Sequence, residues 1–325
     1  MVENPIYVVV DTKDSDKGPE TVILGCSMAL EKYPNLVIAI VGDEKLIKDK
    51  IVELHMDKER VEIIDAPDVI SNFDNPVEAI YKKDQSSLVK ALKLVGEEKY
   101  TGLVTAGNSG AILMGSFKFL STPDRQRPCM AATLPNENGG LTCLVDCGAT
   151  VDCTKGELLQ FAKNGSNFMR NLYQIESPKV ALLSNGAEET KGNKLVKETH
   201  QALKEQQDIN FIGNIEPNRF LSGDADVVVT DGFSGNMALK SIEGMAKRII
   251  TDIVKLSKKT NNPELMNVVG YLMSLYDFGS LGGGVILGAR KPIIKARGNS
   301  DEKAIVSTCG MLVNFANGRA LLERK

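Results

Sequence analysis

The stretch GLVTAGNSGAILMGS, residues 102–116, decides the fold class because it joins an apolar strand, a Gly/Asn/Ser loop and a helix without a break. The same design returns in KVALLSNGAEETKGNKLVKE (179–198) and in DVVVTDGFSGNMALKSIEG (226–244). Strands that alternate with helices form right-handed βαβ units around a largely parallel sheet. The loops after parallel strands meet at one edge of such a sheet, where ligands bind.

The rest of the chain follows the same alternation. Apolar runs rich in Val and Ile predict strands at 6–10, 36–41, 61–64, 102–106, 141–146, 179–184, 209–213 and 226–230. Helical periodicity predicts helices at 19–33, 43–56, 85–98, 108–120, 155–173, 192–206 and 235–258. Most of the apolar runs are continuous, which is typical of strands covered on both faces. Because no repeat or linker interrupts the pattern, we predict a single α/β domain over residues 1–325.

Residues 246–280 depart from the alternation. KTNNP (259–263) stops one helix, and a second helix follows with no strand between them. This arrangement predicts a helical hairpin that projects from the sheet. An apolar stripe at helical spacing runs along its second helix, formed by Leu265, Val268, Val269, Leu272, Met273, Leu275 and Tyr276. The stripe packs in the core or in a dimer, or it docks on lipid or on a partner helix.

The composition is that of a soluble globular protein. The chain has 325 residues, 42% of them apolar, and 39 Lys and Arg against 42 Asp and Glu, a net charge of −3. This balance excludes disorder as the main state. No apolar run approaches the length of a membrane span, and the N-terminus does not resemble an export signal, so we expect a cytoplasmic protein.

The charge is unevenly distributed. Residues 246–325 hold 13 Lys and Arg and 6 Asp and Glu, a net of +7, so residues 1–245 carry −10. A basic C-terminal quarter could face an acidic partner or an anionic membrane, or it could simply be a solvated surface. Nucleic-acid binding is not expected, because basic and aromatic residues do not interleave and most of the chain is acidic.

Histidines and cysteines narrow the chemistry further. The only two histidines, His55 and His200, lie in charged helical stretches, and we expect both on the surface rather than in catalysis. The six cysteines are expected to be reduced thiols. Cys143, Cys147 and Cys153 lie close together in sequence, but they form no CxxC pair and have no histidine beside them. We therefore expect no metal site.

The three glycine-containing loops are the candidate site. Glycine lets the backbone approach a ligand, and the N–H groups that begin a helix point at anions. Neither a GxxxxGK[ST] loop nor a GxGxxG sequence after the first strand is present, so dinucleotide binding is disfavoured and no cofactor is expected. Lys191, just before a helix, is the best candidate for an anion-binding charge; the alternative is an exposed lysine that caps the helix.

Seven strings carry a family resemblance over nearly the whole chain. They are KKDQSSLVKAL (82–92), TAGNSGA (105–111), LVDCGATVDC (144–153), EETKGN (188–193), FIGNIE (211–216), DVVVTDGFSGNMALKSIEG (226–244) and PIIKARGNSD (292–301). In order and spacing they resemble the acyl-acyl carrier protein:phosphate acyltransferases, the PlsX family. The resemblance implies a Rossmann-like three-layer α/β/α fold, akin to the isocitrate and isopropylmalate dehydrogenases, and a homodimer.

The resemblance also implies an activity and partners. Acyl carrier protein would donate an acyl group to inorganic phosphate, and the acyl phosphate would feed phospholipid synthesis. The hairpin would contact the membrane peripherally. The chain departs from the family pattern where Asp-Ala-Met-Gly-Gly-Asp reads Asp11-Thr12-Lys13-Asp14-Ser15-Asp16, and where Lys-Ala-His-Gly reads Lys295-Ala296-Arg297-Gly298.

Two alternatives follow from these departures. One is a short-chain phosphate acyltransferase acting on acyl-CoA or on a protein-bound acetyl group, as in the related subunit of the glycine reductase complex, which carries its acyl group on a cysteine. Cys309 could take that part, although packing in a helix is the simpler role. The other alternative is a non-catalytic scaffold that keeps the fold for dimerisation and for binding membrane or carrier protein.

Phosphate chemistry fits a chain with so few histidines. Inorganic phosphate is largely dianionic near neutral pH and needs no general base, so the protein must supply a phosphate cradle and stabilise the oxyanion. Lys191 would supply phosphate charge, with Asn193 beside it. Asn108 and Ser109 could bind phosphate or the carbonyl oxygen. Asn236 and the Asp231-Gly232 turn would complete the opposite wall, and Lys83 would be a further substrate contact. The catalytic residues are thus predicted to be Lys191, Asn193 and Asn236.

Overall fold

The computed structural model describes residues 4–276 and 283–318, and the described chain divides into two compact units. The first unit takes residues 4–131, 167–176 and 283–318, and the second takes 132–166 and 177–276. The sequence predicted one α/β domain over residues 1–325, and that single domain stays a prediction.

The first unit is built on a mixed, mostly parallel sheet. Its strand order is β3-β2-β1-β4-β11-β10, and residues 129–131 of β5 pair with β10. Only β10 runs antiparallel to its neighbours. The bounds are β1 (Ile6–Asp11), β2 (Leu36–Gly42), β3 (Val61–Asp65), β4 (Tyr100–Thr105), β5 (Cys129–Pro135), β10 (Gly284–Leu287) and β11 (Ile293–Lys295).

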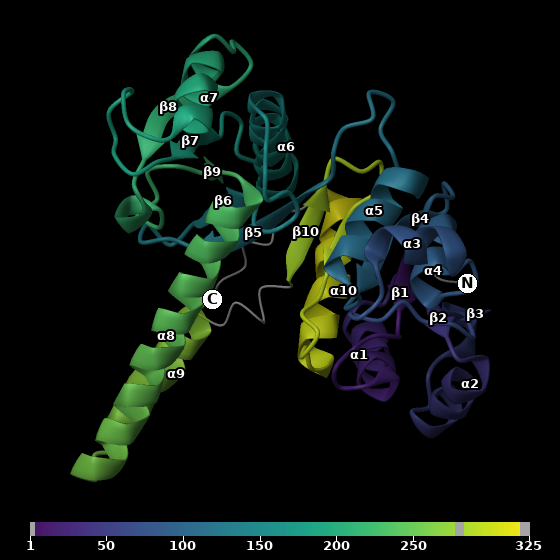
Figure 1. Ribbon diagram of the computed structural model, residues 1–325. Coiled ribbons are helices and arrows are strands. Elements are labelled where there is room, and N and C mark those ends of the chain that lie inside the picture. The colour runs from purple at the N-terminus through teal and green to yellow at the C-terminus, as the bar shows by residue number, and fades with distance from the viewer. Residues whose placement is uncertain (1–3, 277–282, 319–325) are drawn as a thin grey trace. The chain divides into compact units, whose positions relative to one another are not determined.

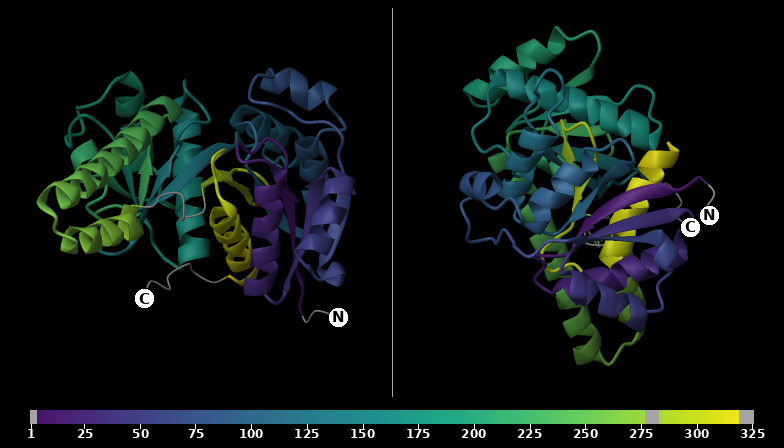
Figure 2. Two further views of the ribbon diagram at one scale, coloured as in Figure 1. Left: turned by 90° about the horizontal axis from the view of Figure 1, so that it is seen from below. Right: turned by 90° about the vertical axis from the view of Figure 1, so that its right-hand side faces the viewer.

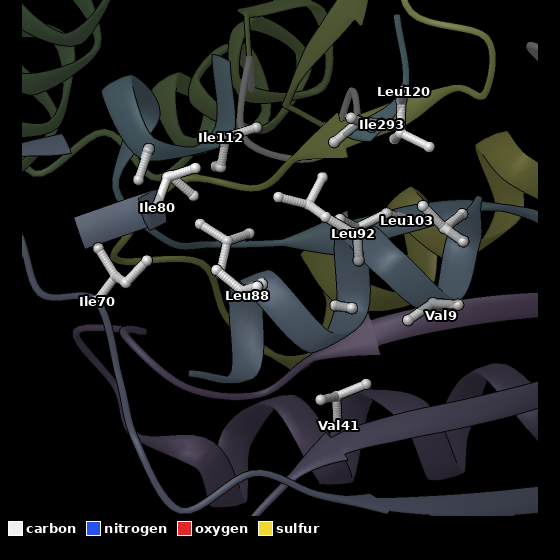
Figure 3. Packing of buried hydrophobic residues seen from close by; sticks show 14 of the residues in the cluster. Val9, Val41, Ile70, Ile80, Leu88, Leu92, Leu103, Ile112, Leu120 and Ile293 are labelled. Carbon is white, nitrogen blue, oxygen red and sulfur yellow. The ribbon is translucent and has the colours of Figure 1, made fainter. Parts of the chain in front are cut away.

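Helices cover both faces of this sheet. Val8, Val9 and Val10 in β1 are all fully buried, and successive strand side chains point to opposite faces. The helices are α1 (Pro19–Lys32), α2 (Glu44–Glu53), η1 (Lys58–Arg60), α3 (Pro76–Lys82), α4 (Ser87–Val95), α5 (Ser109–Phe119) and α10 (Glu302–Asn317). Figure 3 shows the core in which side chains of α3, α4 and α5 meet those of β1, β2, β4 and β11.

The helices α1 and α10 lie side by side, as both views of Figure 2 show. Gly25 permits this approach, because a Cβ atom at that position would lie 2.5 Å from the Cβ of Ile305. Cys309 is fully buried in α10, and the expected packing role in a helix is confirmed.

The second unit carries its own set of neighbouring strands in the order β5-β6-β9-β7-β8, of which the last four are parallel. Their bounds are β6 (Leu141–Val145), β7 (Lys179–Leu183), β8 (Asn210–Ile215) and β9 (Val227–Val229). The helices are α6 (Lys155–Tyr173), whose last turns belong to the first unit, α7 (Lys194–Lys204), η2 (Pro217–Arg219), α8 (Gly232–Thr260) and α9 (Glu264–Tyr276).

The predicted hairpin is present. The long helix α8 runs away from the strands of the second unit, and α9 returns alongside it (Figure 1). The turn follows from the sequence: Asn261 adopts the left-handed conformation with φ of 53°, and Pro263 precedes the first residue of α9. Residues 277–280 of the predicted hairpin lie outside the described residues. Within the described chain, none of the helices combines the length and apolar character that crossing a bilayer requires.

The α/β fold class with a mostly parallel sheet is confirmed. All eight predicted strands and all seven predicted helices are present, with ends that differ by a few residues. The helix α3 and the strands β5, β10 and β11 were not predicted from the sequence.

Candidate functional site

A cavity of about 690 Å³ opens in the second unit where β7 and β9 end. Because these parallel strands are neighbours, the loops that follow them lie next to each other. Polar residues of both loops line the cavity: Ser184, Asn185 and Asn193 after β7, and Asp231 and Ser234 after β9. Two of the three glycine-containing loops are therefore brought together at this cavity.

Local hydrogen bonds shape the loop after β7. The side-chain oxygen of Asn185 accepts from the Gly192 N–H at 2.9 Å, and that of Asn193 accepts from the Val196 N–H at 2.9 Å, which caps α7. Gly192 has a φ of +95°, and a Cβ atom there would lie 2.4 Å from Val196 Cγ1. Only glycine fits this position, so the loop presents the beginning of α7 to the cavity.

Ser184 was missed from the sequence. Its side chain is 6% exposed, and its hydroxyl has no hydrogen-bond partner among the described residues. A buried hydroxyl without a hydrogen-bond partner destabilises the folded protein unless a bound ligand supplies that partner. Gly192 lies close by, since a Cβ atom there would be 3.3 Å from Ser184 Oγ. The available signal was its place directly after an apolar strand.

Lys191 lies in the same loop, but its side chain does not line the cavity. It is exposed, and its stem covers Gly186, where a Cβ atom would lie 2.6 Å from Lys191 Cγ. Its backbone N–H donates to the Glu188 carbonyl at 3.0 Å. The long side chain can rotate toward the beginning of α7, so its role as phosphate charge stays a prediction.

The second wall begins at the cap of α8. Asp231 accepts hydrogen bonds from the amide and the hydroxyl of Ser234, both at 2.8 Å. The Gly232 N–H donates to the Thr150 carbonyl at 2.7 Å, and Gly232 packs on the buried carboxylate of Asp146. Asp231 is thus part of the cavity wall. Gly232 does not line the cavity and instead packs against Asp146 and Thr150.

Asn236 does not line this cavity. It lies on another face of α8, where a Cβ atom at Gly148 would be 3.8 Å from the Asn236 side chain. Gly148 has a φ of +134° and belongs to the turn that Asp146 holds by accepting from the amides of Ala149 and Thr150. The catalytic role of Asn236 stays a prediction, and it would act from that turn.

The third loop belongs to the first unit. Asn108 caps α5 by accepting from the Ala111 N–H at 3.0 Å, and its amide donates to the Ser71 carbonyl at 3.2 Å. Ser109 is the first residue of α5. Lys83 donates to the Asp74 carboxylate at 2.8 Å and to the Val69 carbonyl at 2.9 Å. These contacts tie Lys83 to its own surroundings; the predicted substrate roles of the three residues stay predictions.

Asp11 lies beneath this third loop. Its side chain is fully buried at the end of β1 and accepts from the Thr105 hydroxyl at 2.9 Å. Burial raises the pKa of this carboxyl to about 6, although the Ser87 and Thr105 hydroxyls and the Lys13 amide oppose the rise. The strand β1 therefore ends at a carboxyl whose pKa of about 6 lies well above the ordinary value.

One histidine prediction was wrong. His55 is exposed as expected, but His200 is 2% exposed. Its Nδ1 lies 2.8 Å from the Asn214 side-chain oxygen, and its ring meets that of Phe211 edge to face. The surface prediction for His200 rested on its charged neighbours in the sequence, whereas His200 lies on the buried face of α7. The ring is a packed side chain that does not line the cavity.

The thiols are free, as predicted, and five of the six cysteines are buried. Burial raises the pKa of Cys309 to about 12, so this thiol is neutral and inaccessible. It is unsuited to carrying an acyl group. Among residues 4–276 and 283–318, no group of three or more His, Cys, Asp or Glu side chains is placed to hold a metal ion.

Comparison with known proteins identifies relatives of this chain. The family model described as "Fatty acid synthesis protein" matches residues 6–317. A phosphate acyltransferase of Clostridium perfringens is 41% identical over 307 residues, covering 91% of this chain and 89% of the relative. One of Bacillus pumilus is 38% identical over 308 residues, covering 92% and 90%. The solved phosphotransacetylase of Streptococcus pyogenes shares the fold, with a TM-score of 0.66 at 15% identity over 97% of this chain and 94% of that one.

Proposed function

Because this chain belongs to the PlsX family of fatty acid synthesis proteins, we propose that it is a phosphate acyltransferase that forms acyl phosphate for phospholipid synthesis. The relatives that share 38–41% of its residues over about nine-tenths of the chain are phosphate acyltransferases. The observation that carries the proposal is the buried, unpartnered hydroxyl of Ser184 beside the beginning of α7. An anion bound there would complete it.

The charges in the cavity favour one end for phosphate. The first N–H groups of α7 have no partner within the helix, and the Asn193 side chain satisfies only that of Val196. The Asp231 carboxylate lies on the opposite wall, committed to the amide and hydroxyl of Ser234. Because it repels an anion, phosphate would bind on the α7 side, between Ser184 and Asn193, within reach of Lys191.

The reaction needs little acid–base help. A phosphate oxygen attacks the thioester carbonyl carbon, a C–O bond forms, the C–S bond breaks, and the sulfur leaves as a thiolate that takes a proton from solvent. Phosphate is already largely dianionic near neutral pH. The protein therefore contributes position and charge stabilisation through helix N–H groups, hydroxyls and a lysine.

Acyl carrier protein is the proposed donor, and the assembly is proposed to be a cytoplasmic homodimer with peripheral membrane contact. The basic C-terminal quarter suits an acidic carrier as well as lipid headgroups. The assay supplies palmitoyl-acyl carrier protein and phosphate and traps acyl phosphate with hydroxylamine. Absence of phosphate-dependent hydroxamate with every acyl group from acetyl to stearoyl, on carrier protein or on coenzyme A, would leave the non-catalytic scaffold.

Two substitutions test the phosphate site. Lys191→Ala should raise the phosphate KM or lower kcat at least about tenfold, since it removes a charged contact. Its control is Lys197→Ala, which removes an exposed lysine of α7 outside the cavity lining. A nearly silent Lys191→Ala would remove this residue from the site.

Ser184→Ala should raise the phosphate KM by a similar factor while the thermal unfolding temperature holds or rises, because no internal hydrogen bond is lost. Thr199→Val is its matched control. That residue also holds a buried hydroxyl without a partner among the described residues, but it lies outside the cavity lining. Equal phosphate KM values in wild type and Ser184→Ala would contradict phosphate binding at this end.

A further inference from the structure

A second cavity continues from the candidate site along the hairpin of the second unit. It measures about 470 Å³ and lies between α8 and α9. Ser241 and Ile242 line both cavities, so the two are contiguous along α8. The other lining residues are Leu221, Met245, Ala246, Ile249, Ile250, Leu272 and Tyr276. None of the described residues that line the second cavity is charged.

The combined cavity changes from polar to apolar in one direction. Ser184, Asn193 and Asp231 lie at its first end, and Phe220, Met237 and Ala238 follow before the shared Ile242. Along α8 the lining residues recur at intervals of three and four, which places them on one helix face. The arrangement has the polarity of an amphiphile with an anionic head and an apolar tail.

The length also fits such a ligand. From Ser234 to Ile249 the helix advances by roughly 22 Å at its usual rise per residue. One membrane acyl chain spans about half of a bilayer's hydrocarbon core, roughly 15 Å. The face of α8 is therefore long enough to accompany a long acyl chain from the carbonyl to its end.

Several apolar side chains that line the combined cavity are partly exposed to solvent. Met237 is 47% exposed, Met245 is 61% exposed and Ile249 is 48% exposed. Apolar surface gains free energy when a ligand covers it, and unbranched methionine side chains adapt to ligands of different shape. An acyl chain lying in the combined cavity would cover these side chains and leave its thioester carbonyl at the polar end.

We infer that the second cavity, a groove between α8 and α9, binds the acyl chain of the thioester substrate and so sets the preferred chain length. This inference rests on the proposed phosphate acyltransferase function of the adjoining cavity. Each methylene placed in the groove raises affinity by up to about fourfold, so long acyl groups are favoured over short ones.

The test fills the groove from one wall. Ala246 is a small, half-buried lining residue, and Ala246→Trp should occupy the path of the chain. In hydroxylamine assays without vesicles, kcat/KM for palmitoyl-acyl carrier protein should fall at least about tenfold, whereas kcat/KM for butyryl-acyl carrier protein should stay within about twofold. Val268→Trp on α9 is the control, because Val268 is 44% exposed and lines neither cavity.

A second variant and a binding measurement keep the outcome decisive. Ile249→Asn changes a side chain that is already 48% exposed, and it should lower palmitoyl turnover selectively without loss of folding. Binding of the fluorescent fatty acid cis-parinaric acid should be saturable in wild type and in Val268→Trp, and weakened in both groove variants.

The possible results distinguish failure of the acyl groove from failure of the proposed acyltransferase reaction. Palmitoyl and butyryl turnover that fall together in a folded variant, or that both stay unchanged, would overturn the acyl groove. So would a groove variant that only changes the oligomeric mass, which would give this face to a second copy of the chain. If wild type forms no acyl phosphate but binds cis-parinaric acid through Ala246 and Ile249, the proposed reaction fails and the groove stands.

Discussion

At the scale of single residues, Asp11 makes folding sensitive to pH. The carboxyl has a pKa of about 6 in the native protein, against 3.8 as the ordinary value, because it is buried. Between these two values the native state binds more protons than the unfolded state, so stability falls as pH rises from about 4 to about 6. The full loss is about 3 kcal/mol, from 1.36 kcal/mol for each pKa unit.

Asp11→Asn should therefore flatten this part of the stability curve. The amide keeps an acceptor for the Thr105 hydroxyl and cannot ionise. Urea unfolding at a series of pH values should show that the free energy of unfolding falls about 3 kcal/mol less between pH 4 and pH 7 in the variant than in wild type. Asp49→Asn, an exposed position on α2, should follow the wild-type curve. Parallel curves for Asp11→Asn and wild type would contradict the assignment.

The candidate site was partly visible in the sequence. Asn193 and Asp231 could be predicted because helix caps after apolar strands follow local rules, and both line the cavity. Ser184 could not be singled out, since only the fold reveals that its hydroxyl is buried without a partner. Asn236 does not line this cavity, and its predicted role stays a prediction, because sequence spacing does not tell which face of α8 meets which loop.

At the scale of elements, periodicity predicted the helices and strands that are long and covered. The strands β10 and β11 have four and three residues, which is too short for a pattern. In β5, whose sequence is CMAATLP, small residues separate the larger apolar ones, so no continuous apolar run predicts the strand. The seven-residue helix α3 is also shorter than two clear turns of periodicity. The two short strands pair with segments far away in the sequence, β10 with β5 and β11 with β4.

The start of α8 depends on close contact with the turn at Asp146. A Cβ atom at Gly235 would lie 1.9 Å from the Asp146 carbonyl oxygen, so Gly235→Ala must displace the helix. We expect a loss of about 1–3 kcal/mol in unfolding free energy, together with reduced acyl phosphate formation as the Asp231 cap moves. Thermal unfolding and the hydroxylamine assay measure both effects.

Gly244 provides a matched control within the same helix. Apart from its chain neighbours and the nearby backbone of its own helix, no atom of the described residues lies within 4 Å of the position that a Cβ atom would take there. Gly244→Ala should stabilise the protein by up to about 1 kcal/mol, because alanine favours helix more than glycine does. If Gly235→Ala were as harmless as Gly244→Ala, the tight packing at the start of α8 would be disproved.

At the scale of the whole molecule, opposite charges are segregated along the chain. Residues 246–325 carry a net of +7 and the remainder carries −10. The hairpin combines basic residues with exposed apolar ones: Lys255, Lys258 and Lys259 lie on α8, and Val268 and Tyr271 on α9 are 44% and 63% exposed. Basic charge with exposed apolar side chains is the combination that attracts a protein to an anionic membrane surface.

We therefore expect the protein to sediment with vesicles that contain anionic lipid, and to do so less as salt rises. Because each basic residue near the surface contributes about 1 kcal/mol, the double variant Lys258→Glu/Lys259→Glu should weaken binding at least about tenfold. Lys45→Glu/Lys58→Glu makes the same change in net charge on exposed residues of the first unit and should bind as wild type does. If both double variants lose binding equally, the attraction comes from net charge alone. If the wild type fails to sediment with anionic vesicles while it remains a dimer, the apolar stripe of α9 packs in the dimer interface or in the core.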